Sequence, residues 1–213
     1  MNKYVIFDMD NTLIKTNQLY LDAIHNAANI HLYYDISKHD FIKTQYEIDK
    51  NLHKQYGYEL IRFPESLSKT VEYFADKIPK SKLLLEKEAA FRIGMKVFML
   101  QAEEVDFGFN FISYCKFKGY KTAVITAGEY NNQYNRFNKI SYHHLINKFC
   151  VVLKKNRGVY EEFCKTNNVD ISKSWMIGDS MTGDILPASS IGLKTIHLNV
   201  DNWDIEKSNN KPK

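Results

Sequence analysis

The sequence predicts an α/β protein with a parallel sheet of about five strands, helices on both faces of the sheet, and an all-helical segment inserted after the first strand. Two observations along the 213 residues support this fold class. In the second half of the chain, short β-rich runs alternate with helix-length segments, which is typical of parallel strands joined by crossover helices. Residues 15–106, by contrast, show helical periodicity only.

Five short runs predict the strands, each flanked by turn or helix-start residues. They are Lys3 to Phe7, Lys121 to Ile125, Phe149 to Leu153, Ser174 to Ile177 and Lys194 to Leu198. Four segments between the later strands have the length of crossover helices. They are Phe107 to Lys118, Asn131 to Lys148, Val159 to Asn168 and Thr182 to Ile191.

The inserted segment contains apolar stripes at the spacing of amphipathic helices. These are Leu21, Ile24 and Ala28; Phe41, Ile48, Leu52 and Tyr56 behind Ser37; Leu67, Val71, Phe74 and Ile78 after Pro64; and Leu84, Glu88, Phe91, Met95 and Phe98 behind Ser81. We therefore expect a helical bundle that leaves the sheet after its first strand and returns near Phe107.

Composition limits the classes of protein that fit. With 44% hydrophobic and 25% charged residues the chain can bury a substantial core, and 29 basic against 25 acidic residues is too small an imbalance to indicate nucleic acid. No signal peptide or membrane span is evident, so a soluble, cytoplasmic protein with no membrane partner is expected. Cys115, Cys150 and Cys164 lack metal-site spacing and are expected to be buried thiols.

Polar side chains follow four predicted strands. Asp8 follows the first strand, Thr126 the second, Lys154 and Lys155 the third, and Asp179 the fourth. Because the carboxyl ends of parallel strands share one edge of a sheet, these residues are expected to converge on one crevice. This convergence predicts an active site.

The stretch FDMDNTL places two carboxylates, Asp8 and Asp10, at the end of the first strand. One carboxylate can attack a phosphoryl group and form an aspartyl phosphate, and a second can protonate the leaving oxygen and then activate water. The spacing of the two acids does not assign these roles.

Asp8, Asp179 and Asp184 would bring about three negative charges to a phosphate dianion, which requires a cation. Since all the candidate ligands are oxygens, Mg²⁺ is favoured over Zn²⁺. Lys155 or Lys154 would add a fixed positive charge. The phosphate oxygens would be held by a hydroxyl and two backbone amides, those of Thr126, Ala127 and Gly128.

Four segments resemble, in order, the four motifs of the haloacid dehalogenase superfamily. They are FDMDNTL, VITAG, a lysine within LKKNRGVYEEF, and GDSMTGDI. The resemblance implies a Rossmann-like core, residues 1–14 and 107–200, with a helical cap inserted at residues 15–106. Residues 201–213 then remain as a polar tail.

The same resemblance implies roles for the site residues. It makes Asp8 the nucleophile and Asp10 the general acid and base, which also offers its backbone carbonyl to Mg²⁺. Thr126 becomes a phosphate ligand, Asp179 a metal ligand, and Asp184 a support in or beside the metal site. Lys155 is preferred as the motif lysine because its spacing to Tyr160 suits a packed aromatic residue of the next helix, and Lys154 is the alternative.

The presence of an acid at position 10 also helps to distinguish between two classes of reaction. Expulsion of halide from carbon needs no acid at this position, whereas transfer of a phosphoryl group does. The sequence therefore predicts a Mg²⁺-dependent phosphatase acting on a small phosphorylated metabolite through an aspartyl phosphate. A phosphomutase of the same superfamily and a non-catalytic binding protein of this fold are the alternatives, and the substrate and the oligomeric state are left open.

Overall fold

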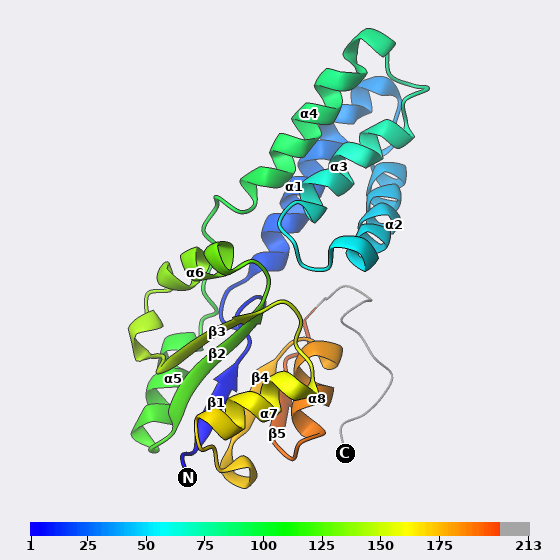
Figure 1. Cartoon of the computed structure of the whole chain (residues 1–213). Coiled ribbons are helices and arrows are strands. Elements are labelled where there is room, and N and C mark those ends of the chain that lie inside the picture. The colour runs from blue at the N-terminus through cyan, green and yellow to red at the C-terminus, as the bar shows by residue number, and fades with distance from the viewer. Residues whose placement is uncertain (201–213) are drawn as a thin grey trace. The chain divides into compact units, whose positions relative to one another are not determined.

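A computed structural model describes residues 1–200, and the predicted polar tail, residues 201–213, lies outside this range. The chain divides into two compact units. Among the described residues, the core unit comprises Met1–Thr16 and residues 102–200, and the helical unit comprises Asn17–Gln101. The helical unit is therefore an insertion that follows the first strand (Figure 1).

The core unit is built on a five-stranded sheet in the order β3-β2-β1-β4-β5, with every neighbouring pair parallel. Its strands are β1 (Tyr4–Phe7), β2 (Lys121–Ala127), β3 (Lys148–Val152), β4 (Trp175–Gly178) and β5 (Lys194–His197). The sequence prediction of a parallel α/β sheet is confirmed. All four residues of β1 are buried, as expected for a central strand covered on both faces.

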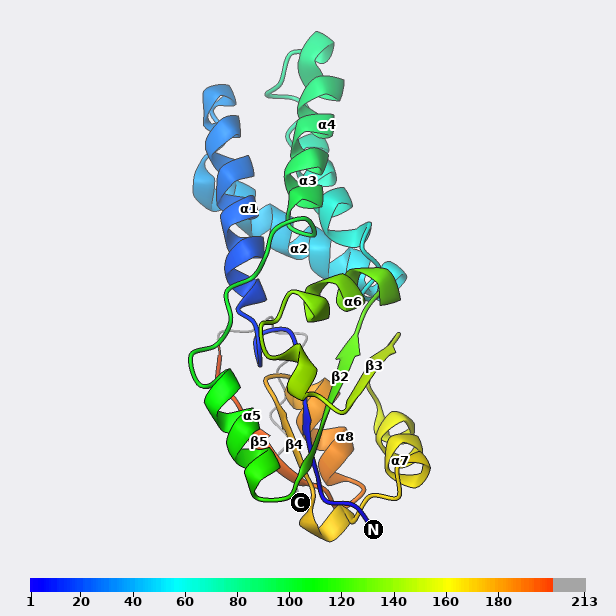
Figure 2. The same cartoon turned by 90° about the vertical axis from the view of Figure 1, so that its left-hand side faces the viewer.

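Helices cover both faces of this sheet (Figures 1 and 2). They are α5 (Gly108–Phe117) and α6 (Tyr130–Asn138) on one face, and α7 (Arg157–Thr166) and α8 (Leu186–Ser189) on the other. On the first face Phe7 packs edge-on against Phe111, and Phe149 stacks on Phe137 at 4.2 Å between ring centroids. On the second face Ile6 and Tyr160 belong to one buried cluster.

Two predicted helices differ from the observed ones. The helix predicted over Asn131 to Lys148 ends at Asn138, because the segment that follows is tied to β2 by hydrogen bonds. The Thr122 hydroxyl donates to the Leu145 carbonyl, and the Asn147 amide donates to the Thr122 carbonyl. The helix predicted over Thr182 to Ile191 begins instead as a π-helical turn, Met181–Ile185, which continues into α8.

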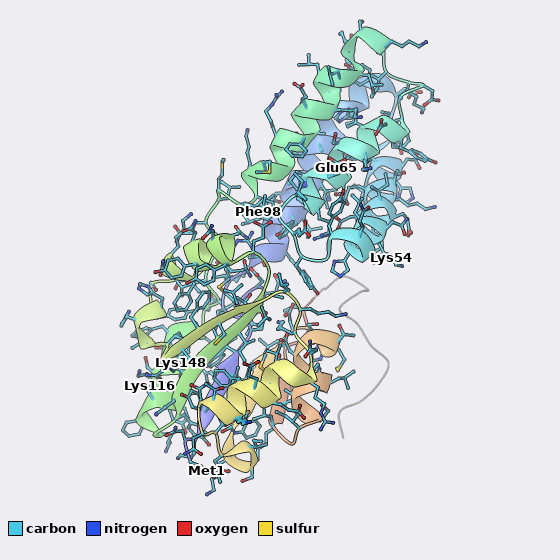
Figure 3. The ribbon with its side chains drawn as sticks, in the orientation of Figure 1. Met1, Lys54, Glu65, Phe98, Lys116 and Lys148 are labelled. Atoms are coloured by element: carbon cyan, nitrogen blue, oxygen red, sulfur yellow. The ribbon has the colours of Figure 1, made fainter. Side chains whose placement is uncertain are left out.

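The helical unit contains α1 (Thr16–His31), a 3₁₀ turn (Leu32–Tyr34), α2 (Lys38–Tyr56), α3 (Arg62–Tyr73) and α4 (Lys80–Lys96). Ser37 caps α2 by accepting a hydrogen bond from the Asp40 amide, as its position before the apolar stripe suggests. The unit has its own apolar core, against which Tyr20 and Phe98 pack, and these two rings meet each other edge-on. Phe98 is labelled in Figure 3. None of the helices in residues 1–200 combines the length and hydropathy needed to cross a bilayer.

The buried face of α4 differs from the predicted stripe. Leu84 is 69% exposed, whereas Ala90 is fully buried. The cause is close contact with α3, because a Cβ at Gly94 would come within 2.6 Å of the Pro64 backbone. Such a contact requires the small residues of α4 to face α3, so the stripe of larger side chains does not define the core side.

Candidate active site

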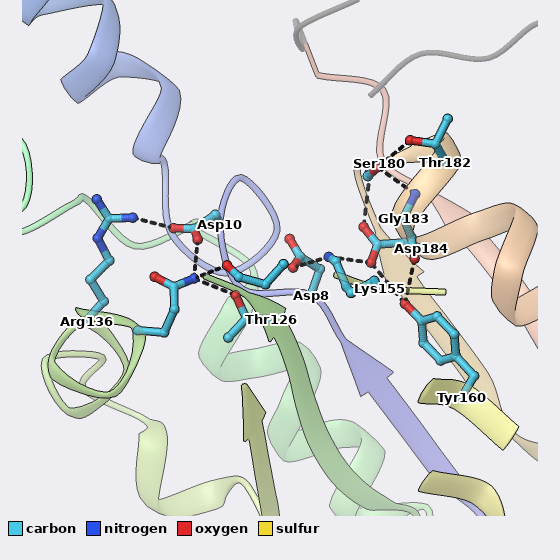
Figure 4. A network of polar contacts seen from close by, with 12 residues as sticks. Asp8, Asp10, Thr126, Arg136, Lys155, Tyr160, Ser180, Thr182, Gly183 and Asp184 are labelled. Carbon is cyan, nitrogen blue, oxygen red and sulfur yellow. Dashed lines mark hydrogen bonds and ion pairs between the residues drawn. The ribbon is translucent and has the colours of Figure 1, made fainter. Parts of the chain in front are cut away.

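The carboxyl ends of the strands bring the predicted residues to one edge of the core sheet. Asp8 follows β1 and its amide donates to the Ile177 carbonyl of β4, which fixes the backbone where the acid begins. Thr126 lies near the end of β2 and Asp179 directly follows β4. Lys155 lies in the loop between β3 and α7, and Figure 4 shows its ammonium between Asp8 and Asp184.

Three buried carboxylates form an acid cluster. Asp8, Asp179 and Asp184 are 3%, 7% and 0% exposed, and each offers one oxygen within 4.8 Å of the other two. Burial raises the pKa of Asp8 well above its usual value, and the charges of Asp184 and Asp179 add to this while Lys155 opposes it. An all-oxygen donor set of this charge fits a hard divalent cation such as Mg²⁺.

Lys155, and not Lys154, reaches the acid cluster. Its ammonium Nζ lies 2.7 Å from Asp8 Oδ1 and 2.6 Å from Asp184 Oδ1, while Lys154 is exposed. Burial disfavours the charged ammonium, but Asp184 and Asp8 together raise the pKa of Lys155 well above its usual value. Lys155 therefore remains a fixed positive charge between the two carboxylates.

Both oxygens of the Asp184 carboxylate accept hydrogen bonds. Besides Lys155, the Ser180 amide donates to Oδ2 at 3.1 Å. The Tyr160 hydroxyl shares its one proton between the Gly183 carbonyl at 3.0 Å and Asp184 Oδ1 at 3.2 Å. Burial and the Asp184 charge raise the pKa of Tyr160 well above its usual value, which keeps its hydroxyl protonated as a donor. Position 178 must be glycine, since a Cβ there would clash with the Asp184 carboxylate.

Asp10 has different surroundings from Asp8, although only Met9 separates them. Its carboxylate turns toward α6, where Gln133 Nε2 donates to Oδ2 at 2.7 Å and Arg136 Nη1 donates to Oδ1 at 3.0 Å (Figure 4). The Asp10 side chain is 26% exposed, compared with 5% for Asp8. The two acids of FDMDNTL are thus held by different partners in environments of different polarity.

The predicted phosphate ligands have different hydrogen-bond partners in this structure. Thr126 is buried, and its hydroxyl oxygen accepts a hydrogen bond from Gln133 Nε2 at 2.7 Å. The Gly128 amide, which was predicted to hold a phosphate oxygen, donates in this structure to the Val152 carbonyl at 3.0 Å. Gly128 has a φ of +140°, and a Cβ there would lie 3.2 Å from Gln133 Cγ. Its role is to allow this backbone conformation and the approach of Gln133.

Sequence reasoning missed two residues that contact the predicted site, Gln133 and Arg136. Both are buried polar residues one helical turn apart on α6. In the polar run YNNQYNRFN no pattern distinguishes them from their exposed neighbours, so only the fold reveals them. Tyr160 was expected as a packed aromatic residue, and its hydroxyl contact with Asp184 is an addition.

The fold and the site together define a class of protein: a parallel α/β enzyme fold whose carboxyl edge carries a buried cluster of carboxylates and one lysine. The family model of haloacid dehalogenase-like hydrolases matches residues 3–192. The chain belongs to this family of hydrolases, which confirms the resemblance carried by the four motifs.

Individual relatives are distant. The glyceraldehyde 3-phosphate phosphatases of Pyrococcus abyssi and Pyrococcus furiosus are 24% and 23% identical to this chain, and cover 92% and 91% of it and 81% and 79% of their own length. A solved haloacid dehalogenase-like family hydrolase from Xanthomonas campestris is 21% identical, with a TM-score of 0.75 over 92% of this chain and 81% of its own. This structural likeness shows the fold.

Proposed function

We propose that this hydrolase is a Mg²⁺-dependent phosphatase that acts on a small phosphorylated metabolite through an aspartyl phosphate on Asp8. The observation that carries the proposal is that the two acids in FDMDNTL have different surroundings. Asp8 is buried and paired with Lys155, while Asp10 is partly exposed and turned toward α6. A nucleophile and a proton-transfer group need different surroundings of this kind.

Asp8 is the group that attacks phosphorus in this proposal. Its carboxylate oxygen forms a bond to phosphorus as the ester P–O bond breaks, and the leaving oxygen takes a proton from Asp10. Lys155 keeps the Asp8 carboxylate in place and adds positive charge beside it. In the second step Asp10 accepts a proton from water, whose oxygen displaces Asp8 from phosphorus.

Mg²⁺ would be held by the carboxylates of Asp8, Asp179 and Asp184, together with the backbone carbonyl that the family resemblance assigns to Asp10. When bound, it supplies positive charge that offsets the repulsion between these acids and the phosphate. The Thr126 hydroxyl and the Ala127 amide remain as the proposed phosphate ligands.

The substrate class rests on the curated relatives, which are named for the dephosphorylation of glyceraldehyde 3-phosphate. A small phosphate monoester is proposed here, and the helical unit, residues 15–106 in the sequence prediction, is proposed as a cap that selects it. Location in the cytoplasm stays a prediction.

The test is release of inorganic phosphate by the purified chain. We expect release from p-nitrophenyl phosphate with Mg²⁺, and loss of release in EDTA or in Asp8→Asn. Asp170→Asn is a matched control, since Asp170 precedes β4 and bonds through its backbone to Asn2, at the opposite edge of the sheet. A rate that is independent of Asp8 and of metal would overturn the proposal.

A panel of phosphorylated metabolites that includes glyceraldehyde 3-phosphate then addresses the substrate. Net release of phosphate from a member of the panel supports a phosphatase. Isomerisation of a sugar phosphate without net release would instead favour the phosphomutase alternative.

A further inference from the structure

Two buried polar side chains on α6 contact the groups that the proposed mechanism uses, yet none of the four motif roles includes them. Gln133 and Arg136 are 2% and 7% exposed, and they lie three residues apart on one face of the helix. Arginine and glutamine are rarely buried so fully unless their polar atoms have partners. Both contact Asp10, which lies more than a hundred residues away in the chain.

Gln133 links three acceptors of the site. Its Nε2 lies 2.7 Å from Asp10 Oδ2, 2.7 Å from Thr126 Oγ1 and 3.1 Å from the Ala127 carbonyl oxygen, so its two N–H groups are shared among three acceptors. Because a carboxylate and a carbonyl can only accept, the amide nitrogen must face them, and the orientation of the side chain is fixed. One side chain thus sets the distance between Asp10 and Thr126.

The bond to Thr126 also fixes the role of its hydroxyl. The oxygen accepts from Gln133, so the hydroxyl proton is left to donate to another acceptor. A phosphate oxygen is an acceptor of the required kind. Gln133 therefore prepares Thr126 as a donor while it holds Asp10.

Arg136 contacts the other oxygen of Asp10. Its Nη1 lies 3.0 Å from Oδ1, on a side chain that is 7% exposed. With one oxygen held by Gln133 and the other by Arg136, rotation of the carboxylate about its last bond is restrained. Such restraint matters because proton transfer needs donor and acceptor within hydrogen-bond reach and correctly oriented.

We propose that Gln133 and Arg136 are positioning residues, which hold the Asp10 carboxyl in the orientation for proton transfer, and that Gln133 also directs the Thr126 hydroxyl toward the phosphate. This inference rests on the proposed phosphatase function and extends it to two residues outside the four motifs. A purely structural role for the pair would affect all substrates alike. A positioning role instead lowers the rate most for those substrates whose leaving oxygen needs a proton from Asp10.

The test compares phenyl phosphate with p-nitrophenyl phosphate, which share a ring but differ greatly in the basicity of the leaving oxygen. Rapid quench measures the rate at which phosphoenzyme forms from each ester in wild type, Gln133→Leu and Arg136→Met. With a misplaced acid, we expect this rate to fall about 10- to 100-fold more for phenyl phosphate than for p-nitrophenyl phosphate. In Gln133→Leu a loss common to both esters is added, because the Thr126 hydroxyl is no longer directed toward the phosphate. Phosphoenzyme should accumulate with p-nitrophenyl phosphate, because hydrolysis of the phosphoenzyme also needs Asp10.

Three further variants complete the design. Arg136→Lys, which keeps the charge, should recover part of the phenyl phosphate rate. Asn135→Leu changes an exposed amide on the same helix and should leave both rates unchanged. If circular dichroism shows that Gln133→Leu does not fold, Gln133→Met replaces it, since it keeps the unbranched length of the side chain, removes the donor and adds no charge.

Equal losses for the two esters, unchanged rates, or a change confined to KM would overturn the positioning role while the wild type remains an active phosphatase. Failure of the proposed function itself would appear differently, as an absence of Asp8-dependent phosphate release in the wild type. The two failures are therefore distinguishable in one experiment.

Discussion

Replacement of Lys155 by methionine removes the positive charge from the acid cluster and keeps much of the side-chain volume. In the wild type, Nζ forms ion pairs of 2.7 and 2.6 Å with Asp8 and Asp184, and the three side chains are only 9%, 5% and 0% exposed. Removal of one partner from a buried ion pair typically costs about 3–5 kcal/mol, because the remaining charge has no compensation. We expect a loss of that size in the stability of the core unit.

Hydrogen exchange of the β1 and β4 amides measures this loss in the core unit itself, where a change of about 3–5 kcal/mol appears as roughly 10²- to 10⁴-fold faster exchange. The measurement is made in EDTA so that no bound cation replaces the lost charge. Lys154→Met is the matched control: Lys154 is exposed, so its replacement should change the stability by less than about 0.5 kcal/mol.

The pH dependence of the loss follows from Asp8. Burial already raises its pKa, and without Lys155, which lowers it, the pKa should rise further. A carboxyl with a raised pKa in the folded state favours folding when protonated, and this stability is lost as the pH rises through that pKa. The difference between Lys155→Met and wild type should therefore be large at neutral pH and shrink in acid. An equally stable variant at neutral pH, or a loss that grows as the pH falls, would refute the reasoning.

Three other predictions concern metal binding, the helical unit and the thiols. Mg²⁺ at about 100 times its Kd should stabilise the wild type by about 2.7 kcal/mol, measured by urea unfolding, and should stabilise Asp179→Asn far less. Arg62→Met leaves Asp49 buried without its ion-pair partner and should cost about 3–5 kcal/mol, seen as faster hydrogen exchange in α2 and α3; adding Asp49→Asn should recover part of this loss. Burial raises the pKa of Cys164 to about 11, so iodoacetamide at pH 8 should modify it only after unfolding.

Each of these predictions has a contradicting outcome. Equal stabilisation of the wild type and Asp179→Asn would place the cation elsewhere. An Arg62→Met variant with wild-type exchange in the helical unit would show that the ion pair contributes nothing. Rapid alkylation of Cys164 in the folded protein, detected by mass spectrometry of its peptide, would contradict its burial.

Much of the site could be predicted because residues that follow parallel strands lie close together at one edge of the sheet, however far apart they are in the sequence. Asp8 and Asp179 each follow an apolar strand, and strands of one direction bring such residues to the same edge. Lys155 was preferred over Lys154 from its spacing to Tyr160, and the observed contacts with Asp8 favour the same lysine. These inferences needed only strand ends and local spacing.

Other features depend on contacts that local patterns do not encode. Gln133 and Arg136 are buried only because α6 packs beside the loop that carries Asp10, and nothing in their own helix indicates this. Leu84 is exposed since Gly94 packs on Pro64 and determines which face of α4 is buried. The Gly128 amide bonds to the Val152 carbonyl because the chain after β2 continues its pairing with β3.

The role of Asp8 as the nucleophile is tested most directly by trapping the phosphoenzyme. A reaction with p-nitrophenyl phosphate and Mg²⁺ is quenched in acid and treated with borohydride, which reduces an aspartyl phosphate to homoserine, and the peptides are mapped by mass spectrometry. We predict homoserine at position 8, increased in Asp10→Asn because hydrolysis of the phosphoenzyme is slowed. Homoserine at another position, or phosphate release with no modified peptide in either protein, would contradict this role.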